Sequence, residues 1–414
     1  MRFEELKLAQ PLLRALTECG YETPTPIQAQ TIPILLEGRD VIASAQTGTG
    51  KTAAFILPAL QRLAAQGPPP ASRRRGAGMP RVLVLAPTRE LAQQVATQSV
   101  RYGQNLRLAT VCLFGGAPYP PQYRDLERGV DVLVATPGRL IDHIERGRVD
   151  LSRLQILVLD EADRMLDMGF QEDVDRICAL APVERQTVLF SATIDGAIAR
   201  LAARLTREAV RIDASTARSS PVAIEQRVHY ADDRAHKYRL LDRLLADAGT
   251  GQSIVFIATK RDAEALANKL QDEGHTAAAL HGDMHQRDRD RTITRMRRGG
   301  VRTLVATDVA ARGIDVPGVT QVINFDLPRQ AENYLHRIGR TGRAGAAGLA
   351  ISLANPMERG TLRQIERYTG ASIPAHVIPG LEPRARHPSA VVRRPQRGGM
   401  MNGRGSHSGW RAGR

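Results

Sequence analysis

The sequence predicts two α/β domains in tandem, each built on a parallel β-sheet that helices cover on both faces. Short apolar runs alternate with segments of helical period along most of the 414 residues, and strands buried on both faces have this composition. A stretch of small polar residues, 213–221, has no core-forming pattern and divides the runs into two groups. The hydrophobic content of 42% suffices for a packed core on each side of that stretch.

Each half of the chain has its own set of predicted strands. In the first half they lie at 41–42, 82–85, 132–135, 156–159 and 188–190, and in the second half at 254–257, 303–306, 322–325 and 349–353. A run of three prolines followed by three arginines within 67–80 predicts a surface loop. We therefore expect an N-terminal segment at 1–30 and the body of the first domain at 31–212, then a linker at 213–221, a second domain at 222–380 and a tail at 381–414.

The charge of the chain indicates a polyanionic partner. The formal net charge is +15 and the isoelectric point is near 10.5. Nearly half of the excess lies in 381–414, which holds eight arginines against one acid, Glu382, and is rich in Gly, Pro and Ser. We interpret this segment as a flexible, basic and disordered tail that binds nucleic acid. A tail that only improves solubility is the alternative.

Several classes of protein are disfavoured. The three cysteines, Cys19, Cys112 and Cys178, are odd in number and far apart, which fits a reducing compartment rather than a disulfide framework or a zinc site. The first residues carry charge where a signal peptide needs an apolar stretch. No segment approaches the length of uncharged apolar sequence that spans a membrane. We therefore expect a cytoplasmic protein without a membrane partner.

Glycines and polar residues gather where the predicted strands end, which is where open parallel sheets bind ligands. The run after 41–42 has the pattern of a phosphate-binding loop. Its glycines let backbone N–H groups approach phosphates, Lys51 adds a positive charge, and the Thr52 hydroxyl can reach Mg²⁺. Position 45 is Ala where the strict pattern has Gly, but a strand precedes the run and a helix follows it. The residues predicted to bind a nucleotide here are Ala45, Gln46, Thr47, Gly48, Thr49, Gly50, Lys51 and Thr52.

Two acids directly follow the predicted strand 156–159. Asp160 is expected to hold Mg²⁺ mostly through water, together with Thr52. Glu161 is placed to orient and deprotonate an attacking water. Acids also begin helices for structural reasons, but two acids after four apolar residues fit that interpretation poorly. The loop and the acids together predict a hydrolase of nucleotides.

These motifs and a series of others in the same order resemble those of the DEAD-box RNA helicases, with the bacterial RhlE-type branch as the best match. The resemblance covers residues 3–380 and implies two RecA-like domains, ATP as the nucleotide and RNA as the partner. Residues 20–28 resemble the family's Q motif. By that resemblance Gln28 would read the adenine edge and Phe3 would stack on the adenine ring.

The resemblance also implies the remaining catalytic groups. In motif VI, at 334–343, Arg340 and Arg343 would be arginine fingers that reach the γ-phosphate across the cleft. The hydroxyls of motif III, 191–193, would link Asp163 to the second domain, and Asp315 would hold the ribose. Taken without the family, motif III is also compatible with a plain polar strand end and motif VI with an exposed basic turn. The residues predicted for catalysis are Lys51, Asp160, Glu161, Asp163, Ser191, Thr193, His336, Arg340 and Arg343.

A further set of motifs resembles the family's RNA contacts. Side chains of these types contact phosphates and sugars rather than base edges. Aromatic residues make up only 4% of the chain, which disfavours a protein that reads RNA by base stacking. We therefore expect a clamp on the backbone of single-stranded RNA with little sequence preference. The residues predicted to bind RNA are Pro87, Thr88, Arg89, Gly116, Thr136, Arg139, Gln286, Arg289 and Thr307.

The resemblance thus implies an RNA-stimulated ATPase that separates short RNA duplexes locally and remodels RNA or RNA–protein complexes. ATP would drive the closure of the two domains on a single strand. Two alternatives are an ATP-gated clamp or annealing scaffold, which the tail supports, and a processive DNA translocase. Asp163 and the pair Phe3 and Gln28 argue against the translocase, because they match the RNA-directed branch. The target RNA, a role in ribosomal or mRNA-decay assemblies, and the oligomeric state are left open.

Overall fold

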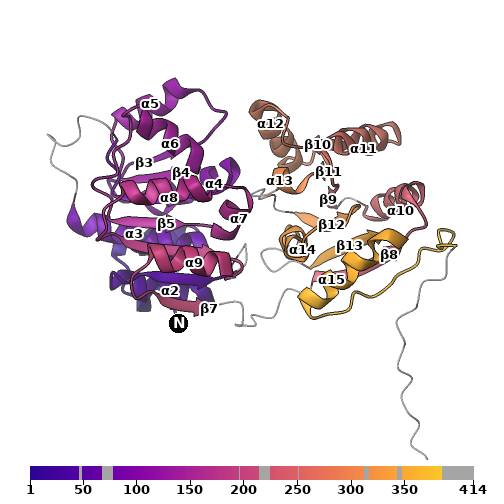
Figure 1. Ribbon diagram of the computed structural model, residues 1–414, viewed down its shortest axis with the longest axis horizontal. Helices are drawn as coiled ribbons and strands as arrows, with labels where there is room; N and C mark the ends of the chain where they lie inside the picture. Colours follow the sequence, from indigo (N-terminus) through magenta and orange to yellow (C-terminus); the bar gives the residue numbers. More distant parts are fainter. Residues whose placement is uncertain are drawn as a thin grey trace, which may run out of the picture.

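Two α/β domains lie side by side in the computed structural model of the chain (Figure 1). The predicted fold class, with a parallel sheet in each domain, is confirmed. The first sheet ends at Asp213 and the second begins at Ile224. Apart from Asp213, the predicted linker lies outside the described residues. The structure describes residues 1–45, 49–67, 78–194, 196–213, 224–249, 251–311, 316, 318–342 and 347–384.

The first domain is built on seven parallel strands in the order β3-β4-β2-β5-β6-β1-β7. Because all pairs are parallel, the carboxyl ends of the central strands lie at one edge of the sheet. The strands are β1 (Val41–Ser44), β2 (Val82–Leu85), β3 (Thr110–Leu113), β4 (Val132–Ala135), β5 (Ile156–Leu159), β6 (Gln186–Ser191) and β7 (Val210–Asp213).

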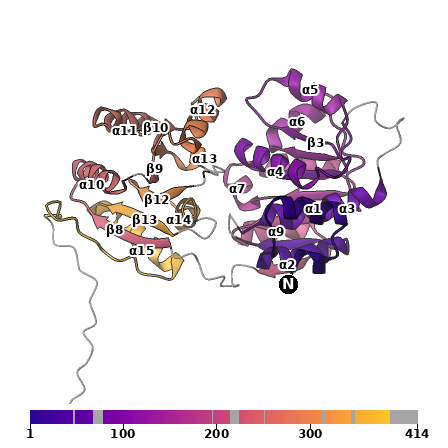
Figure 2. The ribbon, with the colours of Figure 1, turned by 180° about the vertical axis from the view of Figure 1, so that it is seen from behind.

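Helices cover both faces of this sheet, because successive side chains of a strand point to opposite faces. Along β2, Val82 and Val84 pack in one apolar cluster, with α1 to α4, and Leu83 and Leu85 in the other, with α5 to α9. Figure 2 shows α1 in front of the sheet when the molecule is seen from behind. The helices are η1 (Phe3–Leu6), α1 (Gln10–Glu18), α2 (Pro26–Leu36), α3 (Lys51–Gln66), α4 (Arg89–Tyr102), α5 (Tyr119–Glu127), α6 (Pro137–Glu145), α7 (Ala162–Asp167), α8 (Gln171–Leu180) and α9 (Gly196–Leu205).

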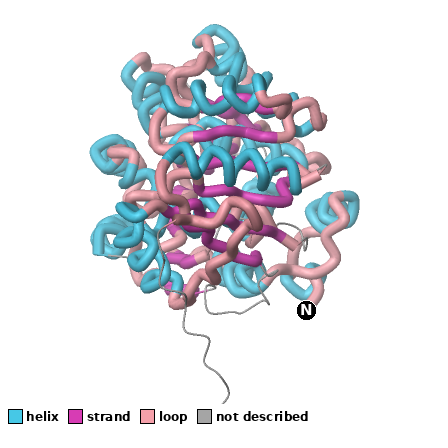
Figure 3. The backbone as a smooth tube through the Cα atoms, turned by 90° about the vertical axis from the view of Figure 1, so that its right-hand side faces the viewer, coloured by secondary structure: helices cyan, strands magenta, loops and turns pink. Residues whose placement is uncertain are grey.

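The second domain has six parallel strands in the order β10-β11-β9-β12-β13-β8. One face packs against α10 and α11 and the other against α12 to α15, and Figure 3 shows its strands enclosed by helices. The strands are β8 (Ile224–Tyr230), β9 (Gln252–Phe256), β10 (Ala277–Leu280), β11 (Thr303–Ala306), β12 (Val319–Asn324) and β13 (Gly348–Ala354). The helices are α10 (Arg234–Asp247), α11 (Lys260–Asp272), α12 (Gln286–Arg297), α13 (Asp308–Ala311), α14 (Ala331–Ile338), η3 (Pro356–Glu358) and α15 (Arg359–Thr369).

The second domain extends slightly past the predicted end at 380. The backbone N–H of Arg384 donates to Asp232 at 2.9 Å, and the Leu381 carbonyl lies 3.0 Å from the Nε2 of His236. These contacts fix the chain to the start of α10, so the predicted tail begins a few residues too early. From 385 onward the tail lies outside the described residues, as do 68–77 of the predicted loop. No helix in the described part of the chain combines the length and apolar character that a membrane span requires.

Candidate ATP and RNA sites

The phosphate loop leads from β1 into α3. Ala45 is buried after the strand, and Gly50 has a left-handed backbone (φ 91°), from which α3 starts at Lys51. The Nζ of Lys51 lies 4.0 Å from Asp160 Oδ1, and both side chains are nearly fully buried. The start of a long helix with a lysine beside it attracts phosphate. Thr49 and Thr52 are also described, whereas the predicted Gln46, Thr47 and Gly48 lie outside the described residues.

Gln28 lies on α2 beside this loop. Its Oε1 accepts from the N–H of Thr25 at 3.0 Å, and its Nε2 donates to the Gly50 carbonyl at 3.0 Å. An amide oxygen has a second lone pair and an amide nitrogen a second hydrogen, so Gln28 can keep both bonds and still pair with an adenine edge. Phe3 is 3% exposed within the core of the first domain, so a base could stack on it only after its neighbours moved.

The two acids follow β5 directly. Asp160 is 2% exposed, and its Oδ1 has no hydrogen-bond partner among the described residues. Burial raises the pKa of Asp160, although Lys51 opposes this shift. A buried carboxylate oxygen without a donor suits a hydrated cation, so the residues present fit Mg²⁺.

Glu161 combines unusual backbone geometry with an excess of nearby positive charge. Its backbone is left-handed (φ 54°, ψ 53°), a conformation that is costly for a residue with a side chain and that often marks functional sites. Burial alone would raise the pKa of this carboxyl, but the cations around it, Arg164 foremost and then Lys51 and Arg340, lower it well below its usual range. Glu161 is therefore ionised at neutral pH.

Motif III joins the acids through its backbone. Asp163 accepts the N–H of Ala192 at 2.9 Å, so a backbone amide of motif III bonds the acid directly. Ser191 is fully buried, and its hydroxyl has no partner among the described residues. Thr193 lines a cavity between the domains together with Asp163 and His336, and so lies where the predicted link would pass.

Motif VI places residues of the second domain beside Glu161 of the first domain. His336, on α14, is half-buried, and this partial burial lowers its pKa to about 3, with Arg164 as the next cause. Arg340 follows α14, is 4% exposed and donates from Nε to the His336 carbonyl at 3.2 Å. Both side chains are close enough to Glu161 to affect its ionisation. The predicted Arg343 and Asp315 lie outside the described residues.

The predicted RNA residues of the two domains meet directly. Arg89, at the start of α4, donates to Gln286 Oε1 at 2.9 Å, and Arg289 on α12 pairs with Glu90 at 2.5 Å. Burial lowers the pKa of Arg89, and the nearby Arg289 and Arg139 add to this effect although Glu90 opposes it. Three guanidinium groups from both domains therefore lie close together, which is a favourable setting for phosphates.

The other predicted RNA residues have visible structural roles. The hydroxyl of Thr88 caps α4 by accepting the N–H of Leu91. Thr136 and Thr307 are buried immediately before α6 and α13, and Pro87 is buried after β2. The Nη1 of Arg139 donates to the Ala117 carbonyl at 3.0 Å, beside Gly116.

Comparisons with known proteins identify the family. Residues 25–201 match the family model described as DEAD/DEAH box helicase, and residues 236–345 match the helicase conserved C-terminal domain. The ATP-dependent RNA helicase SrmB of Haemophilus influenzae is 44% identical over 388 residues, which are 94% of this chain and 87% of that protein. The chain belongs to the DEAD-box family of ATP-dependent RNA helicases.

Solved DEAD-box structures share the RecA-like fold. Dbp5 of Saccharomyces cerevisiae, bound to RNA and ADP BeF3, is 34% identical and superposes with a TM-score of 0.80 over 90% of this chain and 95% of that one. A DEAD box protein from Methanococcus jannaschii has a higher sequence identity to this chain, 38%, and the match covers 91% of this chain and 99% of that one. Its TM-score is nevertheless only 0.52. A TM-score over two domains falls when they are placed differently, so the domains here are arranged like those of the Dbp5 complex. The RhlE-type branch stays a prediction.

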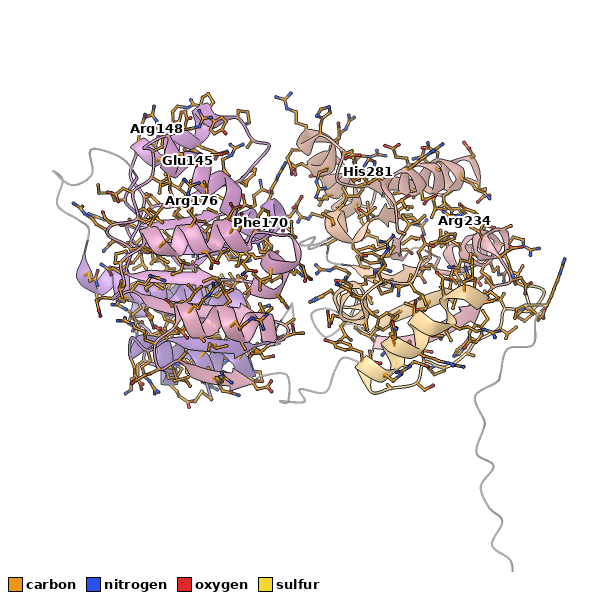
Figure 4. The ribbon with its side chains drawn as sticks, viewed as in Figure 1. Glu145, Arg148, Phe170, Arg176, Arg234 and His281 are labelled. Carbon is orange, nitrogen blue, oxygen red and sulfur yellow. The ribbon has the colours of Figure 1, made fainter. Side chains whose placement is uncertain are left out.

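DEAD-box motif residues that the sequence analysis passed over also occupy the site. Glu90 bonds Arg289 across the cleft, and Arg164 bonds Glu161 at 2.6 Å. The signal for Arg164 was present, because Glu161 and Arg164 are three residues apart at the start of a predicted helix and can therefore pair. Glu90 gave no such signal, since its partner is distant in sequence. In Figure 4, Phe170, which follows α7, lies on the side of the first domain that faces the second.

Gly116→Ala is expected to weaken RNA binding by about 10-fold. Alanine at φ 76° is strained by roughly 1–2 kcal/mol, and its Cβ would overlap Nη1 of Arg89, so the guanidinium must leave its place beside Gln286. Fluorescence anisotropy with labelled RNA measures the change. Gly147→Ala is the matched control, because Gly147 has φ 63° and an added Cβ meets nothing within 4 Å. Equal RNA affinity in the two variants would contradict the placement of Arg89 in the RNA site.

Proposed function

We propose that this DEAD-box protein hydrolyses ATP between its two domains and uses the closure of those domains to separate short RNA duplexes locally. One observation carries the proposal: the buried Lys51 and Glu161 of the first domain lie close to the buried Arg340 and the half-buried His336 of the second. The pairs formed by Arg89 and Glu90 with α12 cross the same cleft. Closure can therefore assemble a nucleotide site and an RNA site together.

The first domain would bind ATP. Gln28 would pair with the adenine edge, the loop 45–52 would surround the phosphates, and Lys51 would neutralise part of their charge. Asp160 and Thr52 would hold Mg²⁺ mostly through water, and the bound ion would supply further neutralisation of phosphate charge. Asp315 keeps its proposed role at the ribose, whereas Phe3 could stack on the base only after its neighbours moved.

The ionised Glu161 would orient the attacking water and accept its proton. Arg340, and Arg343 by its place in motif VI, would stabilise the charge that develops on the γ-phosphate during cleavage. His336 would remain neutral, because its pKa is about 3. Asp163, held by the Ala192 amide, would connect these groups to motif III.

Single-stranded RNA would bind across both domains through its backbone. Arg89, Arg139 and Gly116 would contact it from the first domain, and Gln286 and Arg289 from the second. Following the family resemblance, the clamp would bend the strand, and a duplex cannot follow this bend. One strand would then be expelled locally, and loss of the γ-phosphate would allow the domains to reopen.

The function is tested by steady-state ATP hydrolysis without nucleic acid, with single-stranded RNA and with single-stranded DNA of the same sequence. Strong stimulation by RNA alone is expected, together with unwinding of short but not long duplexes. Equal stimulation by DNA would favour the processive translocase instead. Stimulation by neither polymer would contradict an RNA-gated ATPase.

An ATP-gated clamp or annealing scaffold is the second candidate, and the net charge of +7 in 381–414 favours it. Deleting 385–414 removes seven arginines, and with them the whole +7, and leaves Glu382 and the bond of Arg384 to Asp232 in place. RNA affinity should fall and its salt dependence should flatten, by a slope of about 0.7 for each lost phosphate contact to a single strand. Titrations at several salt concentrations measure this, and an unchanged slope would make the tail a solubilising segment only. Loss of strand annealing with retained unwinding would place annealing in the tail.

We also propose a biological setting. A cytoplasmic protein that remodels ribosomal or mRNA-decay assemblies would fit the charge and the clamp. Copurification of RNA after crosslinking in cells would identify the targets. Recovery of DNA without RNA would argue against this setting.

A further inference from the structure

Arg164 is a buried cation attached to the residue proposed to activate water. It lies in the first turn of α7 and is only 2% exposed. Its Nη1 donates to Glu161 Oε2 at 2.6 Å, and no other hydrogen bond links that oxygen to the described residues. A single charge-assisted bond of this length fixes where the Glu161 carboxylate points.

The other two nitrogens of the Arg164 guanidinium are not hydrogen-bonded to Glu161. Its Nε and Nη2 are both buried and have no hydrogen-bond partner among the described residues. A guanidinium carries five N–H donors in a rigid fork, so fixing Nη1 on Glu161 also fixes the direction of the other donors. Buried donors that lack partners are uncommon in folded proteins and call for a functional explanation.

Arg164 also lines a cavity that the second domain builds. Arg164 is the one first-domain residue among the described residues that line it. Arg337 and Asp308 in its wall are already paired through two bonds of 2.6 and 2.7 Å, so they neutralise each other. The remaining lining residues are Phe256, Ala311, Asn333, His336 and Arg340.

We propose that Arg164 is a positioning residue that couples ATP hydrolysis to domain closure, by holding the Glu161 carboxylate in its working orientation while the second domain covers it. In the closed arrangement the wall of the second domain keeps the guanidinium out of water and pressed toward Glu161. When the domains separate, Arg164 becomes solvated and Glu161 is free to rotate. Because closure also forms the RNA site, hydrolysis then depends on RNA. The inference rests on the function proposed above.

Arg164→Gln tests this in the full-length protein. With saturating single-stranded RNA we expect kcat to fall about 10- to 100-fold, because a base displaced by about 1 Å loses catalytic efficiency of that order. The KM for ATP should change less than about 3-fold, a range in which the free energy of ATP binding is nearly unaltered. Arg164→Lys should recover part of kcat, since an ammonium can reach Glu161 but lacks the fork. Arg176→Gln is the matched control, because Arg176 is an exposed arginine paired only with Glu145 in the described structure.

A double-mutant cycle separates positioning from a general effect on the fold. If Arg164 acts through Glu161, the double variant that carries both Glu161→Gln and Arg164→Gln should have the same single-turnover rate as the single variant Glu161→Gln. Losses that multiply would overturn the inference, as would full kcat in Arg164→Gln. Domain closure, measured by fluorescence energy transfer with RNA and ADP BeF3, should persist in Arg164→Gln, and its loss would make Arg164 structural. Turnover retained by Glu161→Gln would instead refute the proposed base, so the two failures are distinguishable.

Discussion

Glu161→Gln should bind ATP and RNA as the unchanged protein does, yet turn over ATP about 10²- to 10⁴-fold more slowly. Glutamine has nearly the same shape as glutamate, so Arg164 can still donate to the side-chain oxygen over the 2.6 Å bond. The left-handed backbone at this position is also unaffected. What disappears is the ionised carboxylate that accepts the proton of the attacking water. Quench-flow measurement of a single turnover isolates that step.

Two controls make this result specific. Glu172→Gln removes an equal charge from an exposed position in the first turn of α8 and should leave turnover unchanged. Asp160→Asn should weaken ATP binding itself, because this side chain is the one suited to the cation. Full turnover in Glu161→Gln with intact binding would exclude Glu161 as the base.

The fold could be predicted where strands are buried on both faces. The central strands β2, β4, β5 and β6 are apolar runs and were predicted closely. The strands that were missed lie at the edges of the sheets, where one side has no neighbour and polar residues are tolerated. They are β3 (TVCL), β7 (VRID), β8 (IEQRVHY) and β10 (AAAL), and the alanines of β10 resemble a helix.

The candidate site could be predicted as a set of residues but not as a set of contacts. The phosphate loop and the two acids follow buried strands, so their convergence follows from the parallel topology. The bond from Ala192 to Asp163 could not be foreseen, because a backbone amide has no signature in the sequence. The contacts of Arg89 with Gln286 and of Glu90 with Arg289 join residues about two hundred positions apart, and only the placement of the domains reveals them.

The contacts across the cleft support the proposed part of the second domain in catalysis. Lys51, Asp160 and Glu161 are complete within the first domain, so they could bind ATP and a metal ion without help. In the proposed mechanism, motif VI supplies further cations on the γ-phosphate side. Arg340 is 4% exposed there, and its Nε donates to the His336 carbonyl at 3.2 Å. In the proposed mechanism this guanidinium would stabilise the charge of the transferred phosphate.

Arg340→Ala should therefore lower kcat by about 10³-fold or more while the KM for ATP changes little. The charge that Arg340 meets is largest in the transition state, whereas ground-state binding relies on the loop and Lys51 of the first domain. Steady-state ATPase assays with saturating RNA, combined with direct titration of a fluorescent ATP analogue, measure the two quantities separately.

Arg340→Lys distinguishes a finger from a structural arginine. Lysine keeps the charge but loses the planar fork, so a small recovery of kcat is expected for a group that contacts phosphate. Arg243→Ala serves as the control, because Arg243 is an exposed arginine of the same domain that bonds Asp247 at 3.1 Å. An unchanged kcat in Arg340→Ala would exclude Arg340 as an arginine finger. A loss of ATP affinity as large as the loss of kcat would show that Arg340 binds the ground state equally well, and the second domain would then recruit ATP rather than trigger its cleavage.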